Sequence, residues 1–224
     1  MSNARISVVI PSFERPGFAL RSMKFWSGKP VKLHVLDGSA STLSVSELTN
    51  LEDNIRYHHL PIPLLDRLFF ATDLVETDYV LFSCDDDFFV PSALDRLAQQ
   101  LDQRVDLVAC GGRVLTFDFL NDEVVASPAY PRFAGRYISG TKPSERMQQH
   151  MATYQPSTYY SLIRVDAWRR AVRFAAANPL PFYASFEIQI ELALSCLGDS
   201  VIDPSLSRLR SKENAPIRNN EVFL

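Results

Sequence analysis

The first half of the chain alternates short apolar runs with segments whose apolar residues recur at helical spacing. The apolar runs predict strands, and the helical periodicity predicts helices between them. Strands are expected at 5–10, 31–36, 55–59, 79–84 and 105–110, and helices at 18–26, 44–51, 64–75 and 91–101. Strands and helices that alternate with short connections are typical of a parallel α/β sheet with right-handed crossovers.

The pattern changes after Gly111-Gly112. Two short β-rich runs, 114–119 and 123–126, predict a hairpin around Asn121-Asp122. The stretch 127–160 is irregular and rich in Pro, Tyr and Gln, so we expect a long loop region that shapes a binding site. Helices are expected at 165–177 and 184–197, with a strand at 200–202. We predict a single domain over 1–224, in which 5–115 and a smaller mixed part, 116–224, form two halves.

Composition narrows the class of protein. Among 224 residues, 23 Lys and Arg stand against 26 Asp and Glu, a net charge of -3, which argues against a protein that coats nucleic acid. The sequence contains no run of 18 apolar residues, so no transmembrane segment is expected. Cys84, Cys110 and Cys196 form no CxxC pair and lie in apolar stretches, so we expect buried free thiols in a reducing compartment. The beginning MSNARISVVIP resembles no secretory signal, and a cytoplasmic protein, with a peripheral role at a membrane left open, is expected.

Three adjacent carboxylates, Asp85, Asp86 and Asp87, directly follow the apolar run 79–84. Ligands of parallel α/β sheets bind at the carboxyl ends of strands, and adjacent carboxylates repel one another unless a cation or water relieves them. Hard oxygen ligands suit Mg²⁺ or Mn²⁺, which complete their shells with water and substrate phosphates. On an extended segment Asp85 and Asp87 would face one ligand and Asp86 would face elsewhere. The alternative is a solvated acidic turn ahead of the helix that begins at Pro91.

Three motifs in register resemble family 2-type glycosyltransferases of the GT-A fold. ISVVIPSFERP at 6–16 resembles the opening strand and nucleotide loop of that family, and VLDGS at 35–39 resembles its second-strand motif. YVLFSCDDDFFVPSAL at 79–94 resembles the strand that ends in a DxD motif and is followed by a helix beginning at proline. The resemblance covers 5–115 well and the remainder loosely. It implies a mostly parallel central sheet flanked by helices, with a smaller mixed C-terminal part that binds the acceptor.

The same resemblance implies the chemistry. The donor would be a nucleoside-diphosphate sugar, the cofactor a divalent metal, Mn²⁺ or Mg²⁺, and the acceptor a hydroxyl of a saccharide, a lipid-linked molecule or another compound. The nucleoside would lie along the loop formed by Pro11, Ser12, Phe13 and Glu14. Glu14 is alternatively a solvated loop charge.

Further donor-site residues follow from the matched motifs. Asp37 would accept a hydrogen bond from the base ring, or would only shape the turn before Gly38. Arg67 stands where the family often has a residue near the nucleotide, or it pairs with a nearby carboxylate. Asp85 would approach the ribose, and Asp86 belongs to the same donor site. Asp87 would hold the metal.

An inverting transfer needs a carboxylate that takes the proton of the acceptor hydroxyl. Glu187 matches the acidic position of the family, although its usual Glu-Asp pair reads Phe186-Glu187 here. Glu191 lies one helical turn further along the same face and is the rival. The alternative is that both are surface charges, with Glu187 favoured near the positive end of its helix.

Basic residues late in the chain suit a diphosphate leaving group. Arg208 and Arg210 are spaced to face the same way on an extended segment, and Arg210 is the predicted donor-binding residue; a solvated tail is the alternative. His150 is an outside candidate for a metal ligand.

Two other functions are compatible with parts of this pattern. A nucleotidyltransferase would show a Gly-rich loop after the first strand, whereas PSFERPG is poor in glycine. A non-catalytic domain that binds sugar nucleotides would have little reason to keep three adjacent carboxylates.

Overall fold

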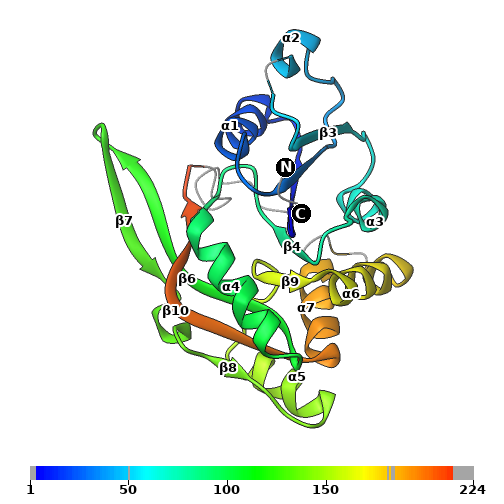
Figure 1. Ribbon diagram of the computed structural model, residues 1–224, viewed down its shortest axis with the longest axis vertical. Coiled ribbons are helices and arrows are strands. Elements are labelled where there is room, and N and C mark those ends of the chain that lie inside the picture. The colour runs from blue at the N-terminus through cyan, green and yellow to red at the C-terminus, as the bar shows by residue number, and fades with distance from the viewer. Residues whose placement is uncertain (1–3, 50, 181, 183–184, 214–224) are drawn as a thin grey trace.

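The computed structural model describes residues 4–49, 51–180, 182 and 185–213. Within them, one ten-stranded sheet runs through both halves of the chain, with strand order β3-β2-β1-β4-β9-β6-β10-β5 (Figure 1). β7 adds to the edge of β6 and β8 to β10. The sheet is mostly parallel at its N-terminal side and mixed at its C-terminal side, as the sequence predicts.

The strands of the N-terminal half lie where the apolar runs predict them. They are β1 (Ile6–Ser12), β2 (Lys32–Asp37), β3 (Ile55–His59) and β4 (Tyr79–Phe82). β1 pairs in parallel with both β2 and β4, and β2 pairs in parallel with β3. The carboxyl ends of these strands therefore meet at one edge, which brings the three sequence motifs together.

Helices cover both faces of the sheet. α1 (Pro16–Trp26) and α4 (Pro91–Gln103) pack on one face, where Met23, Trp26 and Leu97 join a core cluster with β1 and β2. α3 (Leu64–Leu74), α6 (Val165–Ala177) and α7 (Ser185–Leu197) pack on the other, around the fully buried Trp168. The short α2 (Val45–Leu48) begins at Ser44 with a capping box to Glu47.

Three strands depart from the predicted pattern. β9 (Leu162–Arg164) inserts antiparallel between β4 and β6, and the two-residue β5 (Phe88–Phe89) pairs with β10. Neither run is long enough to show a periodicity. β10 (Asp199–Ser211) is much longer than the predicted strand 200–202 and runs parallel to β6.

Gly111 and Gly112 lie inside a strand. The runs 105–110 and 114–119 form one strand, β6 (Leu107–Leu120), that passes straight through them. A Cβ on Gly111 would lie 2.5 Å from Ser161 Oγ, and one on Gly112 would lie 2.6 Å from Ser207 Oγ. The glycines therefore allow close packing against neighbouring segments.

The predicted hairpin is confirmed. β7 (Glu123–Ala129) pairs antiparallel with β6, and Asn121 and Asp122 have φ values of 52° and 64°, as a two-residue hairpin turn of type I′ requires. In Figure 1 the hairpin extends away from the helices.

The prediction of a loop over 127–160 was wrong in part. The stretch contains the 3₁₀ turn η1 (Pro131–Phe133), β8 (Tyr137–Ile138) and α5 (Pro143–Ala152). Polar contacts anchor α5, because Arg146 donates to the carbonyl oxygen of Ser195 in α7 at 2.7 Å. A helix held in this way shows little apolar periodicity, although Pro143 and Glu145 are ordinary signals of a helix start.

Two expectations about the surface have different outcomes. No helix among the described residues is long and apolar enough to span a bilayer. The three cysteines are free, but only Cys110 is fully buried; Cys84 is partly buried and Cys196 is exposed, so the prediction of three buried thiols was wrong.

Candidate active site

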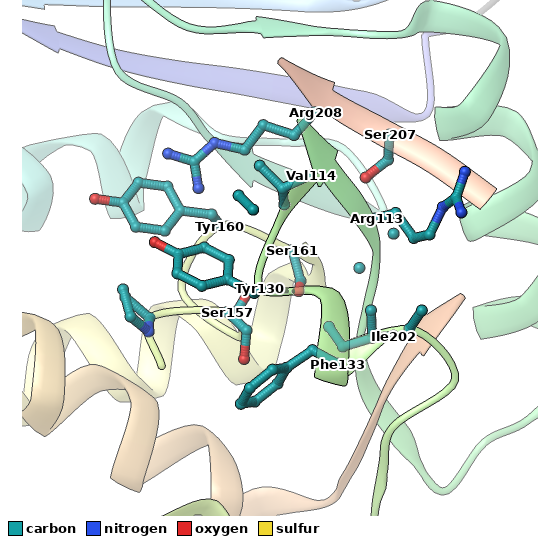
Figure 2. A pocket seen from close by; sticks show the side chains of 15 residues that line it. Arg113, Val114, Tyr130, Phe133, Ser157, Tyr160, Ser161, Ile202, Ser207 and Arg208 are labelled. Atoms are coloured by element: carbon teal, nitrogen blue, oxygen red, sulfur yellow. Dashed lines mark hydrogen bonds between the residues drawn. The ribbon is translucent and has the colours of Figure 1, made fainter. Parts of the chain in front are cut away.

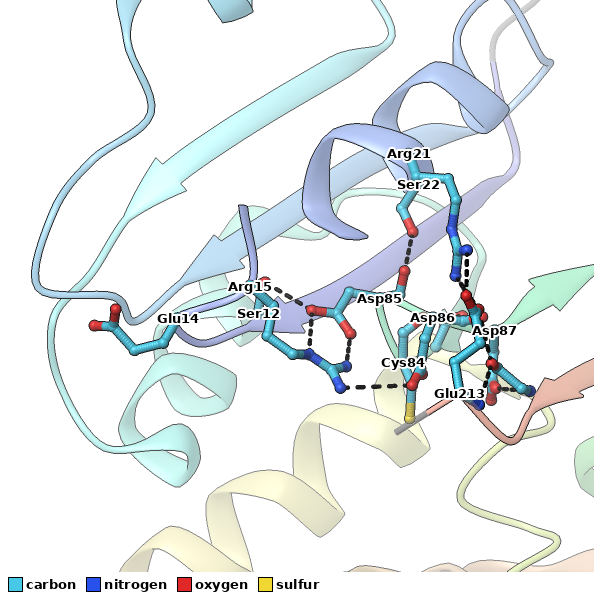
Figure 3. A network of polar contacts seen from close by, with 12 residues as sticks. Ser12, Glu14, Arg15, Arg21, Ser22, Cys84, Asp85, Asp86, Asp87 and Glu213 are labelled. Carbon is cyan, nitrogen blue, oxygen red and sulfur yellow. Dashed lines mark hydrogen bonds and ion pairs between the residues drawn. The ribbon is translucent and has the colours of Figure 1, made fainter. Parts of the chain in front are cut away.

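Asp85, the first carboxylate of the cluster, is buried and held by the loop that follows β1. Ser12 Oγ donates to Asp85 Oδ2 at 2.7 Å, and the guanidinium of Arg15 pairs with the same carboxylate (Figure 3). Ser22 in α1 donates to the backbone oxygen of Asp85 at 2.6 Å. The first and third motifs are thus joined by direct contacts.

Asp87 is buried against the other side of the site. Arg208 Nε in β10 donates to Asp87 Oδ2 at 2.9 Å, its Nη2 contacts the same oxygen, and the backbone amide of Ser211 donates to Oδ1 at 2.9 Å. Burial lowers the pKa of Arg208 while Asp87 raises it, and the net direction is upward. Arg208 and Asp87 therefore form a buried ion pair.

The cluster is not extended. Asp85 and Asp86 lie in a turn, so Asp85 points towards β1 and Asp87 towards β10. The expectation that Asp85 and Asp87 face one ligand was wrong for this reason. Asp86 lies between them, 14% exposed, with its Oδ2 3.5 Å from Arg15. Burial, and then the neighbouring charge of Asp87, raise the pKa of Asp86.

The loops after β1 and β2 are tied to each other. The carboxylate of Glu14 accepts from the backbone amide of Ala40 at 2.8 Å, and the amide of Glu14, at φ 53°, donates to Ser39 Oγ at 2.7 Å. Glu14 is therefore more than a solvated loop charge. Pro11 ends the buried run of β1, and the ring of Phe13 is 61% exposed at this edge.

Asp37 shapes the turn after β2. Its carboxylate accepts from the amide of Ser39 at 2.9 Å and from the hydroxyl of Tyr57 at 2.6 Å. The turn alternative for Asp37 is thus supported by contacts. Its contact with a base ring stays a prediction.

Arg67 lies beneath the same edge. It is 4% exposed, and its Nη1 donates to the carbonyl oxygens of Ser12 at 2.6 Å and Leu36 at 2.7 Å. A Cβ on Gly38 would lie 2.5 Å from this guanidinium, so glycine makes room for it. Through its hydrogen bonds to Ser12 and Leu36, Arg67 holds the carboxyl ends of β1 and β2 together.

Glu187 lies in the first turn of α7 on the opposite side of the site. The hydroxyl of Tyr160 donates to Glu187 Oε2 at 3.2 Å. Burial, and then the charge of Glu191, raise the pKa of Glu187, as suits a general base working near neutral pH. Arg208 stacks on the face of Tyr160, 3.8 Å from the ring centroid, so Asp87 and Glu187 are linked through two side chains.

Glu191, the rival base, is enclosed. It is fully buried, its Oε2 lies 3.0 Å from His150 Nε2, and its Oε1 accepts from the amide of Tyr159 at 2.8 Å. Both oxygens of Glu191 are therefore engaged inside the protein. Across the described part of the chain, no group of three or more His, Cys, Asp or Glu is arranged to hold a metal ion.

A small pocket opens beside these contacts (Figure 2). Tyr160 and Arg208 form one wall, and Tyr130 and Phe133 from the segment after β7 form another. Arg210 does not reach the carboxylates in this structure; it contacts the hydroxyl of Tyr130. The pocket therefore lies next to both the aspartate cluster and the candidate base.

The comparisons with known proteins give the fold. No family model and no curated protein matches the sequence. Among solved structures, S. aureus TarS 1-349 in complex with UDP-GlcNAc matches with a TM-score of 0.63 and 16% identity over 94% of this chain and 59% of that chain. The structure of TarS 1-349 without a named ligand matches with a TM-score of 0.60 and 13% identity, covering 92% of this chain and 60% of the other.

The chain has the GT-A-type fold. It spans about three fifths of the length of the TarS 1-349 chains that it matches. At this level of identity the match establishes the GT-A architecture alone, and the role of each side chain rests on the contacts described above.

The carboxylates of this GT-A edge have the oxygen chemistry that Mg²⁺ and Mn²⁺ prefer. They fit such an ion on the condition that an arginine now paired with them moves away. Arg208 already stands at Asp87 as a cation, and Arg15 stands at Asp85, so the outer carboxylates are charge-balanced without a metal. Asp86 is the carboxylate without a short arginine contact.

Sequence reasoning missed two residues of this site. Arg15 lies within the first motif, but no local pattern indicates that it reaches Asp85, 70 positions away. Tyr160 belongs to a stretch that is rich in tyrosine, and its hydrogen bond to Glu187 depends on the mutual packing of two distant segments.

Proposed function

We propose that the protein is a glycosyltransferase that moves a sugar from a nucleoside-diphosphate donor to an acceptor hydroxyl, with inversion at the anomeric carbon. One observation carries the proposal. A GT-A sheet edge brings Ser12, Asp37 and the aspartate cluster together, and Glu187, a half-buried glutamate with a raised pKa, is linked to that cluster through Tyr160 and Arg208.

The donor side is the edge formed by β1, β2 and β4. The exposed ring of Phe13 offers a face on which a nucleobase can stack. Glu14 and Asp37 fix the two loops between which the nucleoside would lie. TarS was crystallised with UDP-GlcNAc and with UDP, so uridine nucleotides are the first donors to test.

Glu187 would act as the general base. Its carboxylate takes the proton of the acceptor hydroxyl while the acceptor oxygen bonds to the anomeric carbon. The bond from that carbon to the diphosphate oxygen breaks, and its electron pair leaves with the diphosphate. Tyr160 orients the carboxylate through its hydrogen bond. The pocket next to Tyr160 is the proposed place of the reacting sugars.

The leaving diphosphate needs positive charge. Arg208 from β10 borders the pocket, Arg210 contacts the pocket residue Tyr130, and Arg15 lies at the aspartate cluster. A divalent cation, Mn²⁺ or Mg²⁺, held by Asp86 and Asp87, would supply further charge to the diphosphate oxygens when bound.

Donor turnover with water as the acceptor tests the proposal. We expect slow release of UDP from UDP-GlcNAc, followed by chromatography, and we expect proton NMR to show the β-anomer of the released sugar first, because the donor is the α-anomer. Glu187→Gln should abolish release while UDP still raises the melting temperature. Release of the α-anomer first contradicts inversion. Binding without release from any UDP-, GDP- or CDP-sugar would support the non-catalytic alternative.

A further inference from the structure

Arg208 has an unusual position for a strand arginine. It is 4% exposed, both of its contacting nitrogens reach the same oxygen of Asp87, and its guanidinium lies on the ring of Tyr160. By contrast, Arg210, two residues along the same strand, contacts the hydroxyl of Tyr130. Only one of the two arginines therefore neutralises the carboxylate proposed to hold the metal.

Two cations cannot comfortably share this carboxylate. A divalent ion at Asp87 and the guanidinium on the same oxygen would lie a few ångströms apart, where like charges repel strongly. Burial removes most of the solvent that would otherwise screen them. The backbone amide of Ser211 donates to the other oxygen, Oδ1, so both oxygens of Asp87 already accept hydrogen bonds.

The structure also gives Arg208 somewhere to move. Its side chain forms part of the pocket wall together with Tyr160 (Figure 2). A small rotation about its side-chain bonds would take it from the carboxylate into the pocket. The other oxygen of Asp87 is held by a backbone group, the amide of Ser211.

We propose that Arg208 is the resident counter-ion of Asp87 in the donor-free protein, and that a divalent cation binds there only by displacing Arg208 into the pocket. This inference rests on the proposed function for the presence of the cation. It predicts that the free protein binds Mn²⁺ weakly and that Arg208 itself sets this weakness. A permanent structural ion pair would instead make Mn²⁺ affinity indifferent to Arg208, or lower it on loss of the arginine.

Mn²⁺ alone, without nucleotide, is the probe. Binding to the full chain is followed by electron paramagnetic resonance of free Mn²⁺ for the wild type, Arg208→Gln and Arg210→Gln. Both variants lose one positive charge from the same strand. We expect Arg208→Gln to bind Mn²⁺ about tenfold more tightly or better, and Arg210→Gln to change the affinity by less than about threefold. Arg208→Lys keeps the charge and should keep the wild-type affinity.

Folding is a second readout. Arg208→Gln leaves a buried carboxylate without its partner, so its melting temperature should fall and should recover with Mn²⁺ far more than that of the wild type does. If Arg208→Gln folds only when Mn²⁺ is present, the ion has replaced the arginine, as proposed. Equal Mn²⁺ affinities, or failure of Arg208→Gln to fold even with Mn²⁺, would overturn the proposal. Neither result touches the nucleotide-sugar function, which donor turnover decides separately.

Discussion

Ser12 Oγ donates a 2.7 Å hydrogen bond to Asp85 Oδ2, although 73 positions separate the two residues in the chain. The contact joins the end of β1 to the first carboxylate after β4. It exists because β1 and β4 are parallel neighbours, which end at the same edge of the sheet. The site thus begins as a property of the sheet topology.

Loss of this hydroxyl should destabilise the site edge. Ser12→Ala leaves one oxygen of a buried carboxylate with a weaker partner set, so we expect the free energy of unfolding to fall by about 1–3 kcal/mol. Urea denaturation measures the change. Ser41→Ala, at an exposed serine, is the matched control and should be neutral. Equal stabilities of the two variants would show that the contact contributes nothing.

Arg67 should matter for the shape of the nucleotide edge. Arg67→Ala removes a buried donor from the carbonyl oxygens of Ser12 and Leu36. The Ser12 oxygen keeps the amide of Gly38 at 2.9 Å, so we expect a loss of about 1–3 kcal/mol in urea denaturation. UDP affinity, measured by calorimetry below the unfolding transition, should fall as well because both loops rest on this side chain. Unchanged UDP affinity in a folded Arg67→Ala protein would contradict the bracing role.

Phe13 should affect binding and leave stability almost unchanged. Its ring is 61% exposed, so Phe13→Ala removes little packing, whereas the lost stacking on a base is worth about 1–3 kcal/mol. UDP affinity should fall about tenfold or more in calorimetry. Phe174→Ala, at another exposed phenylalanine in α6, should leave UDP affinity unchanged. Similar effects of the two variants would remove Phe13 from the nucleotide site.

The pH dependence of turnover should report the environment of Glu187. A base works only when deprotonated, and the raised pKa of Glu187 places the acidic limb of kcat/KM above the ordinary glutamate value near 4.5. Burial raises that pKa and Glu191 adds to it, whereas the hydrogen bond from Tyr160 and the charges of Arg208 and Arg210 lower it. Glu191→Gln should therefore move the acidic limb to lower pH.

The control for this shift is Glu145→Gln, at an exposed glutamate in α5. It should leave the pH profile of UDP release unchanged. Tyr154, whose own pKa is raised by burial and by both glutamates, lies close enough to Glu187 to be kept intact in all variants. An acidic limb that stays in place in Glu191→Gln would contradict the assignment of Glu187 as the base that Glu191 influences.

The N-terminal half could be predicted because its signals are local. The strands β1 and β4 are mostly apolar runs, β2 and β3 are short β-rich runs, and the carboxyl-end rule alone places Ser12, Asp37 and Asp85 at one edge. The strand β9 could not be predicted, because three residues between two longer strands are chosen by their tertiary neighbours. The same holds for the antiparallel mixing that follows from it.

The carboxylates of the site could be predicted from the sequence, whereas their pairing with particular arginines could not. Three adjacent aspartates are conspicuous in any sequence, whereas the partners of Asp85 and Asp87 lie 70 and 121 positions away. The turn at Asp85 and Asp86, which sends the outer carboxylates in opposite directions, is stabilised by those same partners. Charge pairing across the fold therefore decided what the local pattern left open.

Nucleotide binding tests the central claim most directly. The melting temperature of the protein should be followed with UDP, GDP and CDP, each with and without Mn²⁺. A ligand that binds only the folded protein raises this temperature. The account predicts that one of the three diphosphates raises it at saturating concentration and that Mn²⁺ increases the rise. No shift with any of them, in the presence or absence of Mn²⁺, would contradict it.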